Sequence, residues 1–343
     1  MKKSFAVALA MLILDPTAPG AAGLGQSSDT SREYRYLMGT SVEVRAVGGD
    51  STTRTAAIHE AFAAIAEVDR VMSNWRADSE ITAVNRDAAD FAVHASDALL
   101  SVIEAGQSVS DRSGGAFDLT VGPLVRLWGF RPRHPHLPTH DELASVRSLV
   151  NYHDIQLDRA DHTVRFVRSG VEIDLGGIAK GFAVELAANV LRRRGLDGFI
   201  DAGGNQYMLG RPLGKAVWTV GVRDPDRADS VLGTLDLREG SVSTSAQYAN
   251  FFTVGGRKFG HILDPRTLMP SEASLAVTLY SPDATLADAV SKAVFNLGPV
   301  RGLALIDTYP QMLGVVAYRK PDGTTALAMT DRTRAVFHKM APR

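Results

Sequence analysis

The chain has 343 residues, 45% of them hydrophobic and 22% charged, with a formal net charge of -1 at pH 7. This composition is typical of a globular protein with one large domain or two modest ones. Because no block of like charges occurs, we expect neither nucleic acid nor an anionic membrane surface as the main partner. The chain has no cysteine, which excludes disulfides and thiol catalysis and predicts that no lipid is attached through cysteine.

The N-terminus has the pattern of a secretory signal. Lys2 and Lys3 precede an apolar run from Phe5 to Leu14, and small residues follow. The run is too short to span a bilayer, so we expect no stable membrane insertion. We expect residues 1–22 to be a signal peptide, residues 23–32 a flexible segment and residues 33–343 one catalytic domain in the periplasm, although an ordinary N-terminal helix is the alternative.

The first half of the mature chain mixes strand and helix patterns. Apolar periodicity predicts a strand pair over 33–47, helices over 54–72 and 97–112, a proline-rich loop over 131–138, a short helix after 139, and strands over 154–174. Ser96 and Gly114 are natural caps for the second helix. Thr139 and Glu142 have the spacing of a capping box.

The second half continues with short strands. The pattern predicts a helix over 177–194, strands over 198–202, 205–209, 217–223 and 231–237, a hairpin over 251–262 turning at Gly255-Gly256, a strand over 274–280, a helix over 284–297 and a hairpin over 313–329. Helices and mostly antiparallel strands alternate without a regular βαβ order. This favours an α+β fold.

The stretch DLGGIAKGF, residues 174–182, contains a candidate ligand site. We interpret Val171-Glu172-Ile173-Asp174 as the end of a buried strand that leads through Gly176 and Gly177 into a helix. Bare backbone lets a ligand approach closely, a helix N-terminus suits phosphate, and Lys180 adds a full positive charge. Asp174 could hold a metal or a polar edge of the ligand. An ordinary strand-to-helix turn is the alternative.

Other stretches rich in small and polar residues lie beside apolar strands. They are Gly114–Thr120, Asp201–Asn205, Ser243–Ser245 and Gly260–Pro265. Each alone has a plain structural explanation, such as a helix end or a turn. Together they suggest several loops that converge on a polyanionic ligand.

Two more patterns bear on metal binding. Asp288 and Ser291 are three residues apart on a predicted helix, so they share one face and could help to hold Mg²⁺. An acid that stabilises the helix dipole is the alternative. The histidines at 134, 136 and 140 lie among prolines and are better explained as an exposed loop. Trp75 and Trp128 could stack on a planar ring or pack in the interior.

Taken jointly, these stretches resemble the ApbE family, the FAD:protein FMN transferases. The matching motifs are Met38-Gly39-Thr40, Met72–Glu80, GGAFDLTVGPLVRLWGF (114–130), VEIDLGGIAKGFAVE (171–185), DAGGN (201–205), STSAQY (243–248), GHILDPRT (260–267) and ADAVSKAVFNLG (287–298). Several long motifs in the right order are far more specific than any glycine pair.

The resemblance implies a T-fold-like arrangement of mixed, mostly antiparallel sheets with flanking helices around a central FAD cleft. It implies that a Ser or Thr hydroxyl of an acceptor flavoprotein attacks the FMN phosphorus of FAD, with Mg²⁺ on the diphosphate and AMP as leaving group. The implied FAD contacts are Met38, Trp75, Ala116, Phe117, Asp118, Asp174, Lys180 and Ile262. The implied metal site is Asp288, Ser291 and the main chain near Gly177. We assign catalytic roles to Asp288, Lys180 and His261, the last as base or phosphate partner.

Two departures from the family pattern bear on these roles. Lys292 stands where relatives usually carry a small hydroxyl, and Ala246 stands where they usually carry glycine. Lys292 could contact phosphate or point to solvent. Hydrolysis of FAD by water and flavin binding without turnover remain alternatives, and the acceptor is expected to be a redox-pump subunit or a secreted flavoprotein.

Overall fold

The computed structural model describes residues 29–131, 134–227, 229–247 and 251–340. The expected signal peptide and most of the expected flexible segment lie outside the described residues. The helices are α1 (Ser51–Met72), α2 (Glu80–Asp87), α3 (Asp97–Ser113), α4 (Gly122–Leu127), α5 (His140–Arg147), α6 (Ala179–Arg193), α7 (Ala284–Asp307) and α8 (Asp331–Arg334), with a 3-10 turn η1 (Tyr152–Asp154).

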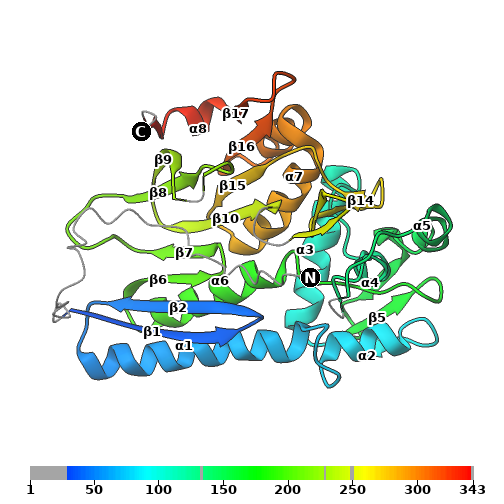
Figure 1. Cartoon of the computed structure of the whole chain (residues 1–343). Coiled ribbons are helices and arrows are strands. Elements are labelled where there is room, and N and C mark those ends of the chain that lie inside the picture. The colour runs from blue at the N-terminus through cyan, green and yellow to red at the C-terminus, as the bar shows by residue number, and fades with distance from the viewer. Residues whose placement is uncertain (1–28, 132–133, 228, 248–250, 341–343) are drawn as a thin grey trace.

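An antiparallel eight-stranded sheet forms the centre of the fold (Figure 1). Its order is β1 (Thr30–Leu37), β2 (Thr40–Val47), β6 (Asp197–Ala202), β7 (Asn205–Leu209), β10 (Gly240–Ala246), β15 (Ala276–Ser281), β16 (Leu313–Arg319) and β17 (Thr325–Met329). Every neighbouring pair in it is antiparallel. This confirms the α+β class.

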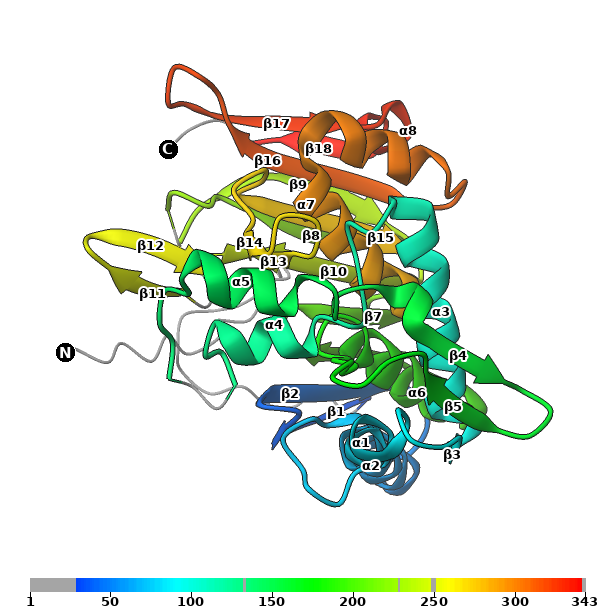
Figure 2. The same cartoon turned by 90° about the vertical axis from the view of Figure 1, so that its right-hand side faces the viewer.

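Four small sheets and hairpins complete the described strands. One sheet has the order β18 (Phe337–Lys339), β9 (Val231–Leu237) and β8 (Trp218–Arg223), and another has β3 (Val93–His94), β5 (Thr163–Phe166) and β4 (Ile155–Asp158). The two hairpins are β11 (Phe251–Val254) with β12 (Arg257–Gly260), and β13 (Leu263–Asp264) with β14 (Met269–Pro270). The β11–β12 hairpin projects from the body of the molecule (Figure 2).

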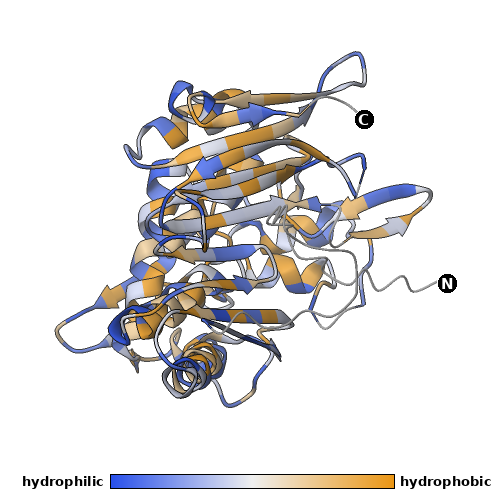
Figure 3. Ribbon diagram, turned by 90° about the vertical axis from the view of Figure 1, so that its left-hand side faces the viewer, coloured by the Kyte–Doolittle hydropathy of each residue, from blue (hydrophilic) through white to orange (hydrophobic). Residues whose placement is uncertain are grey.

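The two faces of the large sheet bury different cores. Successive side chains of a strand point to opposite faces, so Ile200 joins the larger core that includes residues of α1, α3, α6 and α7. Its neighbour Phe199 joins a second core with Trp218 and Leu235 of the small β18-β9-β8 sheet. Orange hydrophobic segments alternate with paler and blue ones along these strands in Figure 3.

Local capping signals predicted several helix ends correctly. The Ser96 side chain accepts from Leu99 N, and Gly114 ends α3 in the left-handed region with φ 61°. The Thr139–Glu142 capping box is present at the start of α5. Gly255 and Gly256, both at positive φ, form the predicted turn between β11 and β12.

The structure corrects the interpretation of residues 171–174. This segment is not a strand, because side chains rather than a neighbouring strand bind part of its backbone. Asn85 accepts from Ile173 N at 2.7 Å and donates to Ile173 O at 2.9 Å. Asn74 donates to the same carbonyl at 2.8 Å. The alternating sequence therefore reflects burial in an irregular segment.

The helix predicted over 284–297 is also longer than expected. The pattern identified its first part, but α7 continues to Asp307 after a break at Gly298, where φ is 73°. Among the described residues, α7 is the one helix that is long and apolar enough to cross a membrane. However, 61% of its most apolar stretch is buried inside the protein. It packs against β10, β15, β16, α3 and α6 as a core helix.

Candidate functional site

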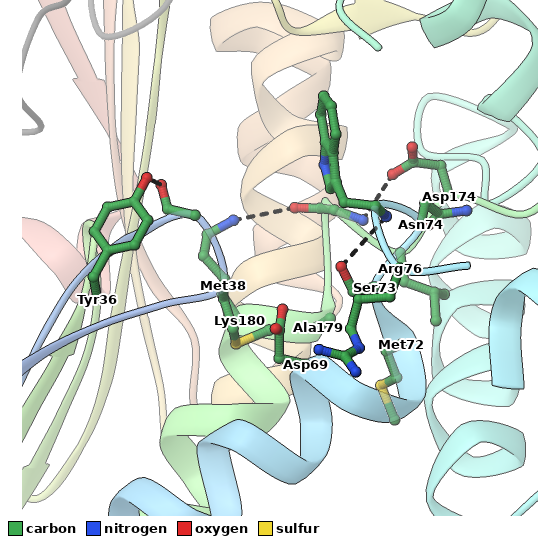
Figure 4. A pocket seen from close by; sticks show the side chains of 14 residues that line it. Tyr36, Met38, Asp69, Met72, Ser73, Asn74, Arg76, Asp174, Ala179 and Lys180 are labelled. Carbon is green, nitrogen blue, oxygen red and sulfur yellow. Dashed lines mark hydrogen bonds between the residues drawn. The ribbon is translucent and has the colours of Figure 1, made fainter. Parts of the chain in front are cut away.

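A cleft of ≈ 380 Å³ opens between the β1–β2 turn, the end of α1 and the start of α6. Four of the predicted FAD contacts line it, namely Met38, Trp75, Asp174 and Lys180. Its other lining residues are Tyr36, Gly39, Asp69, Met72, Ser73, Asn74, Arg76, Leu175, Gly176 and Ala179. Figure 4 shows side chains from the three segments facing this space.

The loop before α6 has the arrangement expected for a phosphate contact. Asp174 Oδ1 accepts from Gly176 N at 2.8 Å and holds the loop in place. Lys180 Nζ donates to Gly176 O at 3.2 Å (Figure 4). The N-cap residue Ile178 makes no side-chain hydrogen bond to the first turn of α6, and within that turn Gly181 N donates to Asp288 Oδ2. A cation and a helix N-terminus thus lie together at the cleft.

Trp75 has the exposure expected of a stacking platform. Its side chain is 59% exposed at the cleft, whereas Trp128 is fully buried and donates its indole N–H to Leu268 O at 2.9 Å. Trp128 therefore packs in the interior, whereas Trp75 is exposed at the cleft and its stacking on a planar ring stays a prediction.

Arg131 pairs with the cleft residue Asp174, a contact that the sequence did not predict. It forms ion pairs with Glu172 and, at 3.4 Å, with Asp174 Oδ2. Glu172 also pairs with Arg126 at 2.5 Å. Burial lowers the pKa of Arg131, and the charge of Asp174 opposes that shift. No sequence pattern links position 131 to position 174, because the contact is made by loops that fold together.

Asp288 lies deeper, where α6 and α7 meet. It is fully buried, and its Oδ2 accepts from Gly181 N at 2.9 Å. Its Oδ1 forms an ion pair with the Lys292 ammonium. Burial lowers the pKa of Lys292, and the Asp288 carboxylate opposes that shift by favouring the ammonium form.

The donors around Asp288 do not fit the expected magnesium site. Ser291 Oγ bonds to Asp288 O at 2.8 Å and to Ser245 Oγ at 2.7 Å. Both carboxylate oxygens of Asp288 already have protein donors, and one of these donors is a cation. Within the described part of the chain, no group of three His, Cys, Asp or Glu residues could hold a metal ion. Magnesium prefers an octahedral set of oxygen ligands, usually with carboxylates, waters and phosphate.

Gly177, the third predicted metal residue, lies beside both Phe117 and Lys292. A Cβ at Gly177 would lie 3.0 Å from Phe117 Cε2 and 3.8 Å from Lys292 Cγ. The tight approach at this glycine is to Phe117, and the Lys292 stem lies at ordinary contact distance from the loop. Phe117 is buried in the main core, and its backbone N–H donates to Ser113 Oγ at 3.2 Å.

Four predicted FAD contacts are absent from the cleft lining that the described residues form, namely Phe117, Asp118, Ala116 and Ile262. Asp118 is buried and accepts from Thr120 N, Thr120 Oγ1 and Tyr152 N, while burial raises its pKa. Ala116 is fully buried, and its carbonyl accepts from Asn296. Ile262 packs in the main core. The contact of these residues with FAD stays a prediction.

His261 lies at the end of the β11–β12 hairpin, next to Gly260. It is half-buried, and the hairpin that precedes it is exposed over most of its length. Its catalytic role stays a prediction. His134 and His136 lie in an exposed loop, as predicted, and His140 is exposed as the first residue of α5. Asp201 accepts from Gly204 N within the β6–β7 turn, which confirms the turn interpretation of that motif.

The sequence matches a known protein family over most of its length. The sequence model of the ApbE family matches residues 38–317. The chain belongs to the ApbE family. A relative called FAD:protein FMN transferase from Treponema pallidum is 29% identical over 92% of this chain and 93% of its own length. One of the same name from Klebsiella pneumoniae is 30% identical over 80% of this chain and 86% of its own length.

Solved structures of ApbE proteins have the same fold. A crystal structure of the ApbE protein from Thermotoga maritima matches with a TM-score of 0.82 and 28% identity, covering 90% of this chain and 99% of that one. The apo form of the flavinyl transferase ApbE from Pseudomonas stutzeri matches with a TM-score of 0.80 and 27% identity, covering 93% and 100%. The ApbE fold expected from the motifs is therefore confirmed.

Proposed function

We propose that this chain transfers the FMN moiety of FAD to a Ser or Thr hydroxyl of an acceptor flavoprotein and releases AMP. One observation carries the proposal: in an ApbE chain, the cleft brings an exposed aromatic side chain, Trp75, together with Lys180 and the start of α6. FAD needs both features, because it joins planar rings through a diphosphate. The activity named for the relatives supports the same assignment.

The reaction balances without an internal nucleophile. The acceptor hydroxyl oxygen forms a bond to the FMN phosphorus, and the bond from that phosphorus to the bridging oxygen breaks. The bridging oxygen leaves with AMP, and the hydroxyl proton passes to a base, for which His261 is our candidate. A positioned base contributes about 10²–10⁴-fold to such a step.

The remaining residues bind and orient FAD. Trp75 and Met38 cover the ring at one end of the cleft, and Lys180 with the N-terminus of α6 meets the negative charge of the diphosphate. Asp174 keeps the Gly176 loop in the shape that this contact needs. Magnesium, which supplies charge neutralisation when it is bound, was expected at Asp288. The groups around Asp288 do not fit this ion, because both carboxylate oxygens already accept from protein donors.

We further propose that the chain acts in the periplasm as a protein without a lipid anchor. Lys2, Lys3, the apolar run that follows and the absence of cysteine support this. A redox-pump subunit or a secreted flavoprotein would be the acceptor.

Product analysis tests the proposal. The purified protein is incubated with FAD, with and without a candidate acceptor domain, and free AMP and free FMN are separated by chromatography. We expect AMP without free FMN, and only when the acceptor is present. Equal amounts of AMP and free FMN without acceptor would indicate a pyrophosphatase, and unchanged FAD in all samples would indicate a binding module.

A further inference from the structure

The cation that lies against Asp288 belongs to the protein itself. Lys292 follows Asp288 by four residues on α7, so the two side chains share one helix face. The ammonium pairs with Asp288 Oδ1, while the carboxylate is fully buried and the lysine side chain is 19% exposed. A buried carboxylate needs such a partner, since an unpaired charge in the interior is strongly unfavourable.

The oxygens around the carboxylate are already engaged. Gly181 N donates to Asp288 Oδ2 at 2.9 Å, and the Ser291 hydroxyl is held between Asp288 O and Ser245. A second hydroxyl, that of Ser243, lies 3.3 Å from Ser291 Oγ. A divalent ion at Asp288 would have to displace Lys292, and the displaced ammonium would remain close enough to repel it.

The position of Lys292 also suits a diphosphate. Its stem passes the Gly177 backbone, which follows Gly176 in the loop at the start of α6. Lys180 Nζ contacts the carbonyl of Gly176 from the cleft side. Two lysines therefore approach the same short loop, one from α6 and one from α7. Lysine binds phosphate as a compact point charge.

We propose that the Lys292 ammonium replaces the divalent metal ion at Asp288, so that this chain binds the diphosphate of FAD without a divalent metal. The inference rests on the proposed function for the identity of the ligand. It concerns residues of this chain alone and assigns Lys292 a role in binding. Asp288 then holds the ammonium in place and acts as a positioning residue.

The direct test measures how much Mn²⁺ the protein retains. The electron paramagnetic resonance signal of free Mn²⁺ reports the amount that stays unbound. Wild type, Lys292→Thr and the control Lys320→Thr are titrated without FAD and then with FAD, beside FAD alone. Lys320 is an exposed residue next to the β16–β17 turn. We expect wild type and the control to retain no more Mn²⁺ than FAD alone accounts for, and Lys292→Thr to retain roughly one ion per chain with FAD present. Retention of one Mn²⁺ per chain by wild type would overturn the proposal, whether or not the variant folds.

A second test measures the affinity for FAD in excess EDTA, which removes divalent metal ions. We expect EDTA to change the Kd of wild type for FAD by less than about twofold, and Lys292→Thr to bind at least about tenfold more weakly in EDTA than in Mg²⁺. A tenfold loss for wild type in EDTA would contradict the proposal. Absence of FAD binding by wild type under all conditions would instead refute the proposed function, and the Mn²⁺ titration without FAD would still decide the role of Lys292.

Discussion

The backbone N–H of Gly181 donates to the buried carboxylate of Asp288 at 2.9 Å, which joins the first turn of α6 to α7. The helices are close at this point: a Cβ at Gly181 would lie 2.2 Å from the carbonyl oxygen of Ala284 and 2.7 Å from Asp288 Cβ. One contact thus fixes both the start of the cleft helix and the orientation of Asp288.

Gly181→Ala tests this close approach. Helix propensity alone predicts that alanine stabilises a helix by about 1 kcal/mol relative to glycine. Because the added methyl group would meet backbone, we expect the opposite, a loss of about 1–3 kcal/mol in the free energy of unfolding. Urea unfolding followed by circular dichroism measures the change. A variant more stable than wild type would show that α6 and α7 are not in contact here.

The Asp288–Lys292 pair is expected to act as a unit in stability. Asp288→Ala leaves a buried ammonium without its partner, so we expect a loss of about 3–5 kcal/mol and no turnover. Lys292→Met in the same chain should recover a large part of that stability. Urea unfolding of the two single variants and the double variant gives the coupling energy. Additive losses would mean that the two groups do not interact.

The two tryptophans provide a matched comparison. Trp75 is exposed in the cleft, so Trp75→Ala should weaken FAD binding by about 0.5–1.5 kcal/mol, the range for aromatic pairs, with little change in the free energy of unfolding. Trp128 is fully buried, so Trp128→Ala should cost about 3–5 kcal/mol of stability. Flavin fluorescence titration and urea unfolding measure the two effects. Unchanged FAD affinity in Trp75→Ala would remove the stacking role.

Asp174 is expected to act on FAD through the loop that it holds. Asp174→Ala removes the acceptor for Gly176 N and one of the two carboxylates that pair with Arg131, so we expect the loop to lose its fixed shape. We expect FAD affinity to fall about tenfold, equivalent to about 1.4 kcal/mol. Asp161→Ala, in an exposed turn, is the control and should bind as wild type does. Equal FAD affinities for the two variants would contradict the assignment.

The raised pKa of Glu185 predicts that the stability of the protein depends on pH. The Glu185 carboxylate accepts from Ala284 N at 3.1 Å at the start of α7, and burial with the nearby charge of Asp283 raises its pKa above the ordinary 4.5. The folded chain therefore holds this proton to higher pH than the unfolded chain does. The stability that this group contributes is complete below 4.5 and is lost as pH rises through its raised value.

Glu185→Gln keeps an acceptor for the α7 backbone but cannot ionise. We therefore expect the variant to become more stable relative to wild type as pH rises from about 4 to 7. Urea midpoints measured across this interval give the difference. A difference that stays constant with pH would show that Glu185 titrates alike in the folded and unfolded chains.

Sequence periodicity and capping chemistry predicted the long helices and most strands of the large sheet, but not the short elements α2, α4, α8, β3 and β18. The signals at Ser96, Gly114 and Thr139 are local, and local hydrogen bonds fix those helix ends. β10, a central strand, was missed. Its sequence GSVSTSA lacks an apolar alternation, because serine side chains occupy several of its buried positions, and one of them, Ser245, bonds to Ser291 of α7. Burial without apolar residues leaves no periodic signal.

The sequence motifs identified several residues of the candidate site, but they did not predict which side chains contact one another there. Met38, Trp75, Asp174 and Lys180 meet at one cleft, as the family resemblance implied. Arg131 was missed, because its partners are more than 40 positions away in the sequence. For Lys292, the sequence left open whether it contacts phosphate or points to solvent, and the packing of α7 turns it onto Asp288.

The intact mass of an acceptor protein tests the central claim most directly. The acceptor domain is incubated with this protein and FAD, beside a copy of the domain whose target Ser or Thr is replaced by alanine. The account predicts that the acceptor gains the mass of one FMN less water, located on that hydroxyl by peptide mapping, and that the alanine copy gains nothing. An acceptor of unchanged mass while FAD is consumed would contradict protein flavinylation.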